Sequence, residues 1–206
     1  LLIWGLQLTF LLAAPCAIAL LIFGEPLAAV LYHYGKFNAL DVLMTQRALA
    51  AYGVGLIGLI LVKILAPGFY SRQDIRTPVK IGLFVLVATQ LANLVFVPWL
   101  GHAGLALSVG AGACLNAALL WVGLHKRGAL PSAAWAGYLG KLFLALIPFS
   151  AVLFYAAHAH QWIALQAEPW TRIGLLALWL GAAALVYFGA LALVGIRWQK
   201  FLRHAK

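Results

Sequence analysis

The sequence has very little charge. Only 9% of its 206 residues are charged, and four of these are acidic against 14 lysines and arginines. A soluble domain of this length needs a polar surface, which so few charges cannot supply. Long polar tracts are absent as well, so the sequence predicts no separate soluble domain.

The scarcity of acids also limits the chemistry. Enzymes that act on polyprenyl phosphates usually gather several acids or histidines around a metal, and four acids spread along the chain cannot do so. His158 and His160 lie two apart, but Glu168 is the only nearby acid for a metal site. We see no catalytic triad and no paired carboxylates. The sequence therefore predicts no metal, no cofactor and no catalytic residue.

Cysteine is nearly absent too. Cys16 and Cys114 are the only two, and both lie inside apolar runs. This setting is typical of small helix residues and disfavours a redox or metal role. The chain begins at Leu1 without an initiator Met or a basic leader, which we interpret as a fragment of a longer sequence.

Hydrophobic residues are abundant. They make up 66% of the chain, and the mean hydropathy is +1.02. Roughly 20 apolar residues in a helix cross a hydrocarbon core of about 30 Å. Four long runs carry no charge, and they cover residues 1–24, 81–125, 142–167 and 173–196. The sequence therefore predicts an all-α, polytopic membrane helix bundle.

Helix start and stop signals divide the chain into six spans. Asp41 is a plausible N-cap, Pro67 and Gly68 predict a helix end, and a turn at Pro98–Gly101–His102 splits the longest run. A short amphipathic or looped stretch is expected over 25–40. The predicted spans are 2–23, 41–66, 79–97, 103–124, 138–157 and 171–196.

Lysine and arginine are distributed unevenly between the two sides of these spans. If the first span starts in the cytoplasm, ten basic residues lie on that side and three lie opposite, which predicts that both ends of this chain are cytoplasmic. Their position in loops favours contact with anionic membrane lipids over nucleic acid. The cytoplasmic set is Arg72, Arg76, Lys80, Lys126, Arg127, Lys141, Arg197, Lys200, Arg203 and Lys206; the opposite set is Lys36, Arg47 and Arg172.

Glycines recur at close spacing in two spans. Gly53, Gly55 and Gly58 match the G-x-G-x-x-G pattern, but inside a membrane helix they indicate close packing or bending instead of nucleotide binding. Gly104, Ser108 and Gly112 recur every fourth residue, which predicts a groove for close helix approach. A sliding interface used during transport is the alternative interpretation.

Two cations stand in or near the second span. Lys63 is the charge well inside an apolar run, and it either reaches the headgroups or faces a central cavity and attracts a phosphate. We predict the cavity. Arg47 lies sixteen residues earlier, about 160° away around the helix, so the two are not expected to form one clamp.

Uncharged polar residues lie in the third and fourth spans. Thr89 and Asn93 are four apart and share a helix face. Together with Ser108 they are candidates for helix-to-helix hydrogen bonds or, alternatively, for contacts with a polar substrate or a monovalent cation.

Two blocks of sequence carry a resemblance to a known family. The first contains Ala14-Pro15, Gly24-Glu25-Pro26-Leu27, Gly35-Lys36-Phe37, Asp41 and 48–52; the second contains 62–70, Asp74 and 76–81. Together they resemble the MurJ (MviN) family of bacterial lipid II flippases, in the multidrug/oligosaccharidyl-lipid/polysaccharide exporter superfamily. The second block is the more specific.

The resemblance implies an architecture and a cargo. The six spans are similar to the last six of a fourteen-helix, two-lobed transporter of the bacterial inner membrane. Residues 1–125 would supply four helices of the C-terminal lobe, and residues 126–206 a final helix pair that forms a groove for a lipid tail. The cargo would be lipid II, an undecaprenyl-pyrophosphate-linked muropeptide. The main cationic cavity residues would belong to the missing N-terminal lobe, the partner of this piece.

The resemblance also bears on ion coupling and motion. Some members hold a sodium ion with a carboxylate between helices that match the third and fourth spans, and this chain has no acid there. Candidate hinges are Pro15, the 53–58 run and Pro148. The alternatives are another exporter of the superfamily, a polyprenyl-lipid membrane enzyme, or a structural scaffold without transport.

Overall fold

The computed structural model describes residues 2–128 and 135–195, and every regular element in these ranges is helical. Six of the helices are long and apolar enough to cross a membrane, which confirms the predicted number of spans and the all-α fold class. The elements are α1 (Leu2–Ile22), α2 (Gly24–Tyr32), α3 (Ala39–Tyr70), α4 (Arg76–Leu100), α5 (His102–Lys126), α6 (Trp135–Ala159), the 3₁₀ helix η1 (Ala164–Ala167) and α7 (Pro169–Leu193). The chain is a multi-pass membrane protein.

The end of α3 differs from the prediction. The helix continues through Pro67 to Tyr70, because one proline near a helix end removes a single hydrogen bond and the rest of the turn can still form. Gln73, with φ of 58°, ends the helix in the left-handed conformation. Its N–H donates to the Tyr70 carbonyl at 2.9 Å, and the Asp74 N–H donates to the Phe69 carbonyl at 3.1 Å. This is a Schellman ending with glutamine in the position that glycine usually takes.

The start of α3 also corrects a prediction. Asp41 is not the N-cap, because α3 already begins at Ala39. The Asn38 side chain accepts the Asp41 N–H at 3.0 Å, and the Asp41 carboxylate accepts the Asn38 N–H at 2.9 Å. This reciprocal pair is a capping box, in which Asn38 is the cap and Asp41 stands three residues into the start of the helix.

The turn between α4 and α5 is shorter than predicted. Helix α4 runs through Pro98 to Leu100, α5 begins at His102, and Gly101 alone separates them. Gly101 has a φ of 57°, which glycine adopts without the steric cost of a side chain. The last helix ends at Leu193, before the predicted 196. The predicted basic tail of Arg197, Lys200, Arg203 and Lys206 lies outside the described residues.

Contacts divide the chain into two compact units. Unit 1 contains Leu1–Ala17 and Ala51–Trp135, and unit 2 contains Ile18–Ala50 and Ala136–Lys206. Helices α1 and α3 therefore contribute to both units. The predicted division at residue 125 rests on the resemblance to a two-lobed flippase, and it stays a prediction.

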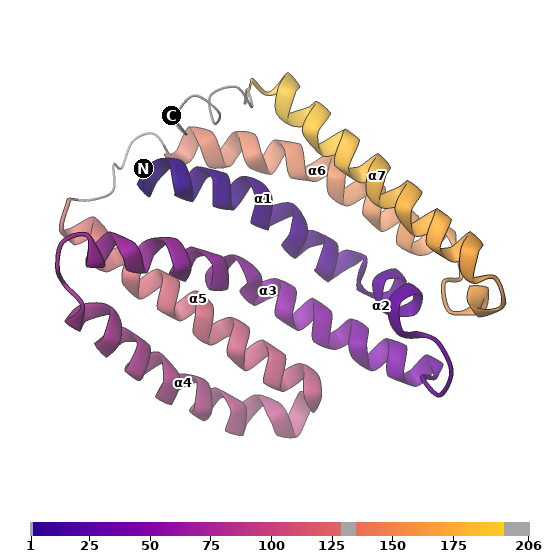
Figure 1. The fold of residues 1–206 in the computed structure, drawn as a ribbon, viewed down its shortest axis with the longest axis horizontal. Coiled ribbons are helices and arrows are strands. Elements are labelled where there is room, and N and C mark those ends of the chain that lie inside the picture. The colour runs from indigo at the N-terminus through magenta and orange to yellow at the C-terminus, as the bar shows by residue number, and fades with distance from the viewer. Residues whose placement is uncertain (1, 129–134, 196–206) are drawn as a thin grey trace. The chain divides into compact units, whose positions relative to one another are not determined.

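Unit 1 is built on α4 and α5, which lie side by side and antiparallel (Figure 1). An apolar core joins α1, the second half of α3 and α5, and Phe10, Ile57 and Trp121 are among the partly buried residues that pack against it. The buried members of this core are Leu6, Leu61, Leu65, Phe69, Ala117, Leu120 and Leu124.

Unit 2 contains α2, the first half of α3, α6 and α7. Helix α2 packs against α7, and η1 lies against α7 as well. The fully buried Trp162 meets the fully buried Phe23 edge to face, with ring centroids 5.6 Å apart. Its indole N–H donates to the Ala156 carbonyl at 3.1 Å. The segment between α6 and α7 is thereby fixed to the end of α1.

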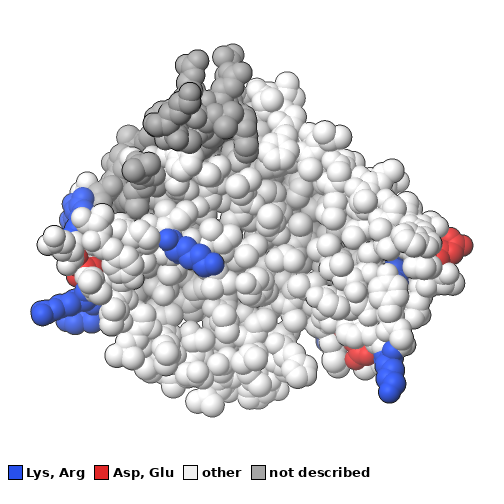
Figure 2. Space-filling view, viewed as in Figure 1, with Lys and Arg blue, Asp and Glu red and all other residues white. Residues whose placement is uncertain are grey.

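Figure 2 shows where the charges lie on one face of the molecule. Lysine, arginine, aspartate and glutamate form a few small, separate groups on the visible face, and most of the visible surface is uncharged. Large apolar side chains remain exposed on several spans, including Leu94, Trp99 and Leu185. Such a surface suits contact with lipid chains or with other membrane helices.

Candidate functional site

Helix α5 presents small residues to α4. A methyl group added to Gly104 would overlap the Phe96 carbonyl oxygen, and one added to Gly112 would overlap Oγ1 of Thr89. Ser108, halfway between the two glycines, is fully buried. Small residues at every fourth position thus let two backbones approach closely, as in other membrane helix pairs.

A second set of small residues joins α5 to α3. A methyl group on Gly55 would overlap the Cα of Gly110, and one on Gly58 would lie 2.6 Å from the backbone nitrogen of Cys114. Gly53 is also buried in this part of α3. The 53–58 segment is continuous helix, so it lacks the strand and turn that a dinucleotide-binding loop requires. Gly55 and Gly58 therefore allow the α3 and α5 backbones to pack closely.

The polar residues of α4 and α5 belong to unit 1. The Ser108 hydroxyl donates to the Gly104 carbonyl of its own helix at 2.9 Å, and the Thr89 hydroxyl lies against Gly112. Asn93 donates from Nδ2 to the Gln90 side-chain oxygen at 3.3 Å. Its own Oδ1 is buried and has no hydrogen-bond partner among the described residues.

The two predicted cations are both exposed. Lys63 belongs to the half of α3 in unit 1, and Arg47 belongs to the half in unit 2. Exposure of Lys63 is compatible with a cavity and with a headgroup contact, so its predicted role stays a prediction.

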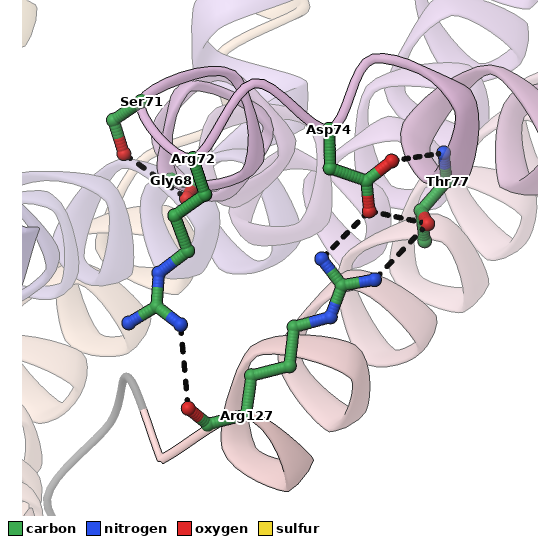
Figure 3. Close-up of polar contacts among 6 residues, drawn as sticks. All are labelled: Gly68, Ser71, Arg72, Asp74, Thr77 and Arg127. Atoms are coloured by element: carbon green, nitrogen blue, oxygen red, sulfur yellow. Dashed lines mark hydrogen bonds and ion pairs between the residues drawn. The ribbon is translucent and has the colours of Figure 1, made fainter.

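A cluster at the ends of α3, α4 and α5 joins three segments of unit 1 (Figure 3). The Arg127 guanidinium forms an ion pair with Asp74 at 2.6 Å and donates to the Thr77 hydroxyl at 3.2 Å. It also lies over the Phe69 ring, 4.9 Å from the centroid. Arg72 donates to the Arg127 carbonyl at 3.3 Å. We call Asp74, Thr77 and Arg127, with Arg72 and Phe69, the Arg127 cluster.

Asp74 lies two residues before Arg76, the first residue of α4. Its carboxylate accepts the Thr77 hydroxyl at 2.6 Å and the Thr77 N–H at 3.1 Å, which is an N-cap interaction. These two hydrogen bonds, followed by the one from Arg127, lower the pKa of Asp74 from 3.8 to about 2. The carboxylate is therefore ionised at every physiological pH.

The proline hinge candidates lie inside unbroken helices. Pro15 lies in α1 and Pro148 lies in α6. Two residues after Pro148, the Ser150 hydroxyl donates to the Leu146 carbonyl at 2.7 Å, a side-chain bond that often bends helices. The hinge role of both prolines stays a prediction.

The histidines of the segment between α6 and α7 have separate partners. His158 lies 2.8 Å from the Phe154 carbonyl through Nδ1, while His160 accepts the indole N–H of Trp179 at 3.2 Å. Within residues 2–128 and 135–195, no three metal-binding side chains come together.

Sequence reasoning missed one buried charge. Arg172 was counted only as an outer-side cation, yet its side chain is fully buried in unit 2. A signal was available, because Glu168 and Arg172 are the only charged residues between Lys141 and Arg197. The pairing of Arg127 with Asp74 was not predicted either, since it depends on where two helix ends meet.

Comparison with known proteins identifies the family. The family model described as Lipid II flippase MurJ matches residues 1–170. The chain is 52% identical over 204 residues to "Lipid II flippase MurJ" of Burkholderia cenocepacia, covering 98% of this chain and 40% of that protein. It is 36% identical over 196 residues to "Probable lipid II flippase MurJ" of Haemophilus influenzae, covering 94% of this chain and 38% of that protein. This chain thus spans about two fifths of the length of these relatives, and it belongs to the MurJ family.

Proposed function

We propose that this chain is part of a flippase that moves lipid II from the inner to the outer leaflet of the bacterial cytoplasmic membrane. The observation that carries the proposal is the 52% identity to a lipid II flippase over 98% of the chain. Six apolar helices long enough to span a membrane support it. The resemblance of the second sequence block to the MurJ family supports it separately, because that resemblance rests on motif and not on the number of helices.

The physical requirement for such a protein is clear. A pyrophosphate-linked sugar head cannot cross hydrocarbon unaided, because an unpaired charge in an apolar medium costs many kcal/mol. A polar cavity between two lobes shelters the head while the polyprenyl tail stays in lipid. Residues 1–125 would belong to one lobe, and residues 126–206 would form the final helix pair beside it. The remaining lobe is the partner of this chain, which is not expected to transport alone.

The proposed orientation places both ends of the chain in the cytoplasm. The segment between α3 and α4 and the end of α5 carry Arg72, Arg76, Lys80, Lys126 and Arg127. Basic residues beside short loops favour the cytoplasmic side. Cysteine labelling from outside the cell tests this: a cysteine at position 72 should be protected, and one at position 36 should be labelled.

Lys63 is the residue of this chain that we propose for contact with the phosphate of the cargo, and Arg47 is a weaker candidate. The exposed position of Lys63 and its place in an apolar span support the proposal. Lys63→Ala in the full-length protein should lower transport, whereas Lys80→Ala, which removes an exposed lysine near a helix start, should not. Equal activity of the two variants would remove Lys63 from the site.

Thr89, Asn93 and Ser108 are proposed as polar or cation contacts. The unpartnered Oδ1 of Asn93 supports a role in binding a donor or a monovalent ion. Asn93→Leu should change the dependence of transport on sodium if an ion binds there. Leu91→Ala is the control, because Leu91 is an exposed apolar residue of the same helix.

Complementation tests the function as a whole. The full-length gene should restore growth and shape to cells depleted of their own lipid II flippase. Failure in spite of normal membrane insertion would favour another exporter of the superfamily or a scaffold. A metal-dependent activity on polyprenyl lipids in the purified protein would instead favour an enzyme.

A further inference from the structure

Arg172 is a buried cation whose hydrogen-bonding capacity is largely unused. Its side chain is 0% exposed. Nη2 donates to the His33 carbonyl at a long 3.4 Å, while Nε and Nη1 have no hydrogen-bond partner in the part of the chain that the structure describes. No carboxylate among these described residues pairs with it.

The groups around Arg172 only partly compensate its charge. The guanidinium lies over the Tyr34 ring, 5.0 Å from the centroid, and cation–π contact of this kind is favourable. His33 is the C-cap of α2, so the positive charge also lies at the negative end of that helix. A guanidinium buried without an anion nevertheless remains costly, because its desolvation is repaid only by good ion pairing and satisfied donors.

A second buried group at the same contact lacks a partner. His33 is 4% exposed, and its Nδ1 has no hydrogen-bond partner in the described structure. His33 and Arg172 are neighbours through the His33 carbonyl. The unpaired Nε and Nη1 of Arg172 indicate an absent acceptor, because buried polar groups in native proteins are nearly always satisfied. The Nδ1 of His33 is a further buried atom without a partner among the described residues, and it donates or accepts depending on the tautomer.

The position of Arg172 along α7 points to the kind of acceptor. It is the fourth residue of a 25-residue apolar span that begins at Pro169, so it lies near the end of the hydrocarbon core, at the depth of the headgroups. Trp170, two residues earlier, is 84% exposed, as is common for tryptophan at a membrane interface. Phosphate oxyanions are concentrated at this depth, and guanidinium matches their geometry with two parallel hydrogen bonds.

We propose that Arg172, with His33 beside it, forms a binding site for a phosphate group, supplied by an anionic lipid headgroup or by free phosphate. The inference rests on the membrane setting of the six helices and does not depend on the cargo of the transporter. Its role is to fix α2 to the start of α7 through the bound oxyanion.

Tyr34 controls access to this site. The guanidinium is fully buried, so an anion reaches Nε and Nη1 only when a covering side chain moves. The Tyr34 ring lies on the guanidinium and is 43% exposed. It precedes Gly35, which has a φ of 59° and an open surrounding. Tyr34 is thus a partly exposed side chain over the guanidinium, and its displacement would open a path to Arg172.

Native mass spectrometry of the full-length protein in detergent tests the site. The probes are phosphatidylglycerol, phosphatidylcholine and inorganic phosphate, added separately. Wild-type protein should retain phosphatidylglycerol, and Arg172→Gln should weaken that binding about tenfold or more. Arg76→Gln, which removes an exposed arginine of unit 1, is the matched control and should bind as wild type does.

The lipid and phosphate arms distinguish the two sources. If the protein retains inorganic phosphate but not phosphatidylglycerol, free phosphate is the occupant. If it retains phosphatidylglycerol selectively, the lipid headgroup is the occupant. Tyr34→Ala keeps both Arg172 and His33 and should speed exchange of the bound group, which provides a readout even if Arg172→Gln folds poorly. Equal binding by wild type and Arg172→Gln, or a carboxylate from elsewhere in the full-length protein seated on Nε, would overturn the proposal.

Discussion

Arg127 in unit 1 and Arg172 in unit 2 differ in how their positive charges are compensated. Arg127 is 38% exposed and has a carboxylate, a hydroxyl and an aromatic ring around it. Arg172 is fully buried, with an aromatic ring and one neutral carbonyl. The better-partnered arginine is thus the one that water can also reach.

This difference distinguishes a structural cluster, whose charged groups find partners within the chain, from a candidate binding site, whose charged group does not. The Arg127 cluster is satisfied by residues from three segments of unit 1, so nothing external is required there. Within the described residues, two donor atoms of Arg172 have no acceptor, which in a native protein calls for a ligand, a water molecule or another part of the chain.

The largest contrast is expected from Arg172→Met. Without anionic lipid or phosphate, removal of an unpaired buried charge should leave the protein as stable or raise its stability by about 1–4 kcal/mol. Addition of phosphatidylglycerol should raise the melting temperature of wild type and leave that of Arg172→Met unchanged. A loss of stability in lipid-free detergent would mean that Arg172 already has a protein partner.

Glycine packing provides the next contrast between the units. Gly58→Ala places a methyl group against the α5 backbone of unit 1, and should lower stability by about 1–3 kcal/mol. Gly181→Ala in unit 2 has open space around it, and should be neutral or stabilising by about 0.5–1 kcal/mol because alanine favours helix. Thermal unfolding in detergent measures both, and similar effects would contradict the described α3–α5 contact.

Two substitutions at Asp74 separate the contributions of the ion pair and of the helix-start hydrogen bond to stability. Asp74→Asn keeps the side-chain oxygen that accepts the Thr77 N–H but removes the ion pair, and should lower the stability only slightly because the pair is partly exposed. Asp74→Ala removes that hydrogen bond as well and should lower the stability further. A double-mutant cycle with Arg127→Gln isolates the pair energy. A coupling of zero would mean that the pair adds no stability.

The smallest effect is the pH dependence of this cluster. Folding lowers the Asp74 pKa from 3.8 to about 2, so the carboxylate favours the folded state at pH values above 3.8. This contribution is lost as the pH falls toward 2. Between pH 8 and pH 5, the stability difference between wild type and Asp74→Asn should stay constant. A difference that changes in this range would point to another titrating group.

Much of the fold was predictable because the bilayer restricts it. A chain in hydrocarbon must satisfy its backbone within each helix, so long apolar runs translate directly into spans. The helix ends were less predictable. Pro67 and Pro98 did not stop their helices, because a stop depends on whether the next residues find capping partners, as Gln73 and Gly101 do.

The candidate sites were only partly predictable. The spacing of Gly104, Ser108 and Gly112 is visible in the sequence, but the neighbour of each glycine is not. The unpartnered Oδ1 of Asn93 is a property of its surroundings. Because a single sequence does not state which residues meet across 50 or more positions, neither the Asp74–Arg127 pair nor the Arg172–His33 contact was foreseen.

The sequence alone determined the membrane setting, the six spans and the family, because hydropathy, helix length and motif are local properties of the chain. Only the tertiary structure decided which charges are satisfied. Arg127 and Arg172 are the same residue type near the ends of apolar helices, and the sequence does not state which of them has a partner. Their surroundings decide this, because the free energy of a charge depends on the dielectric and the partners that folding places around it.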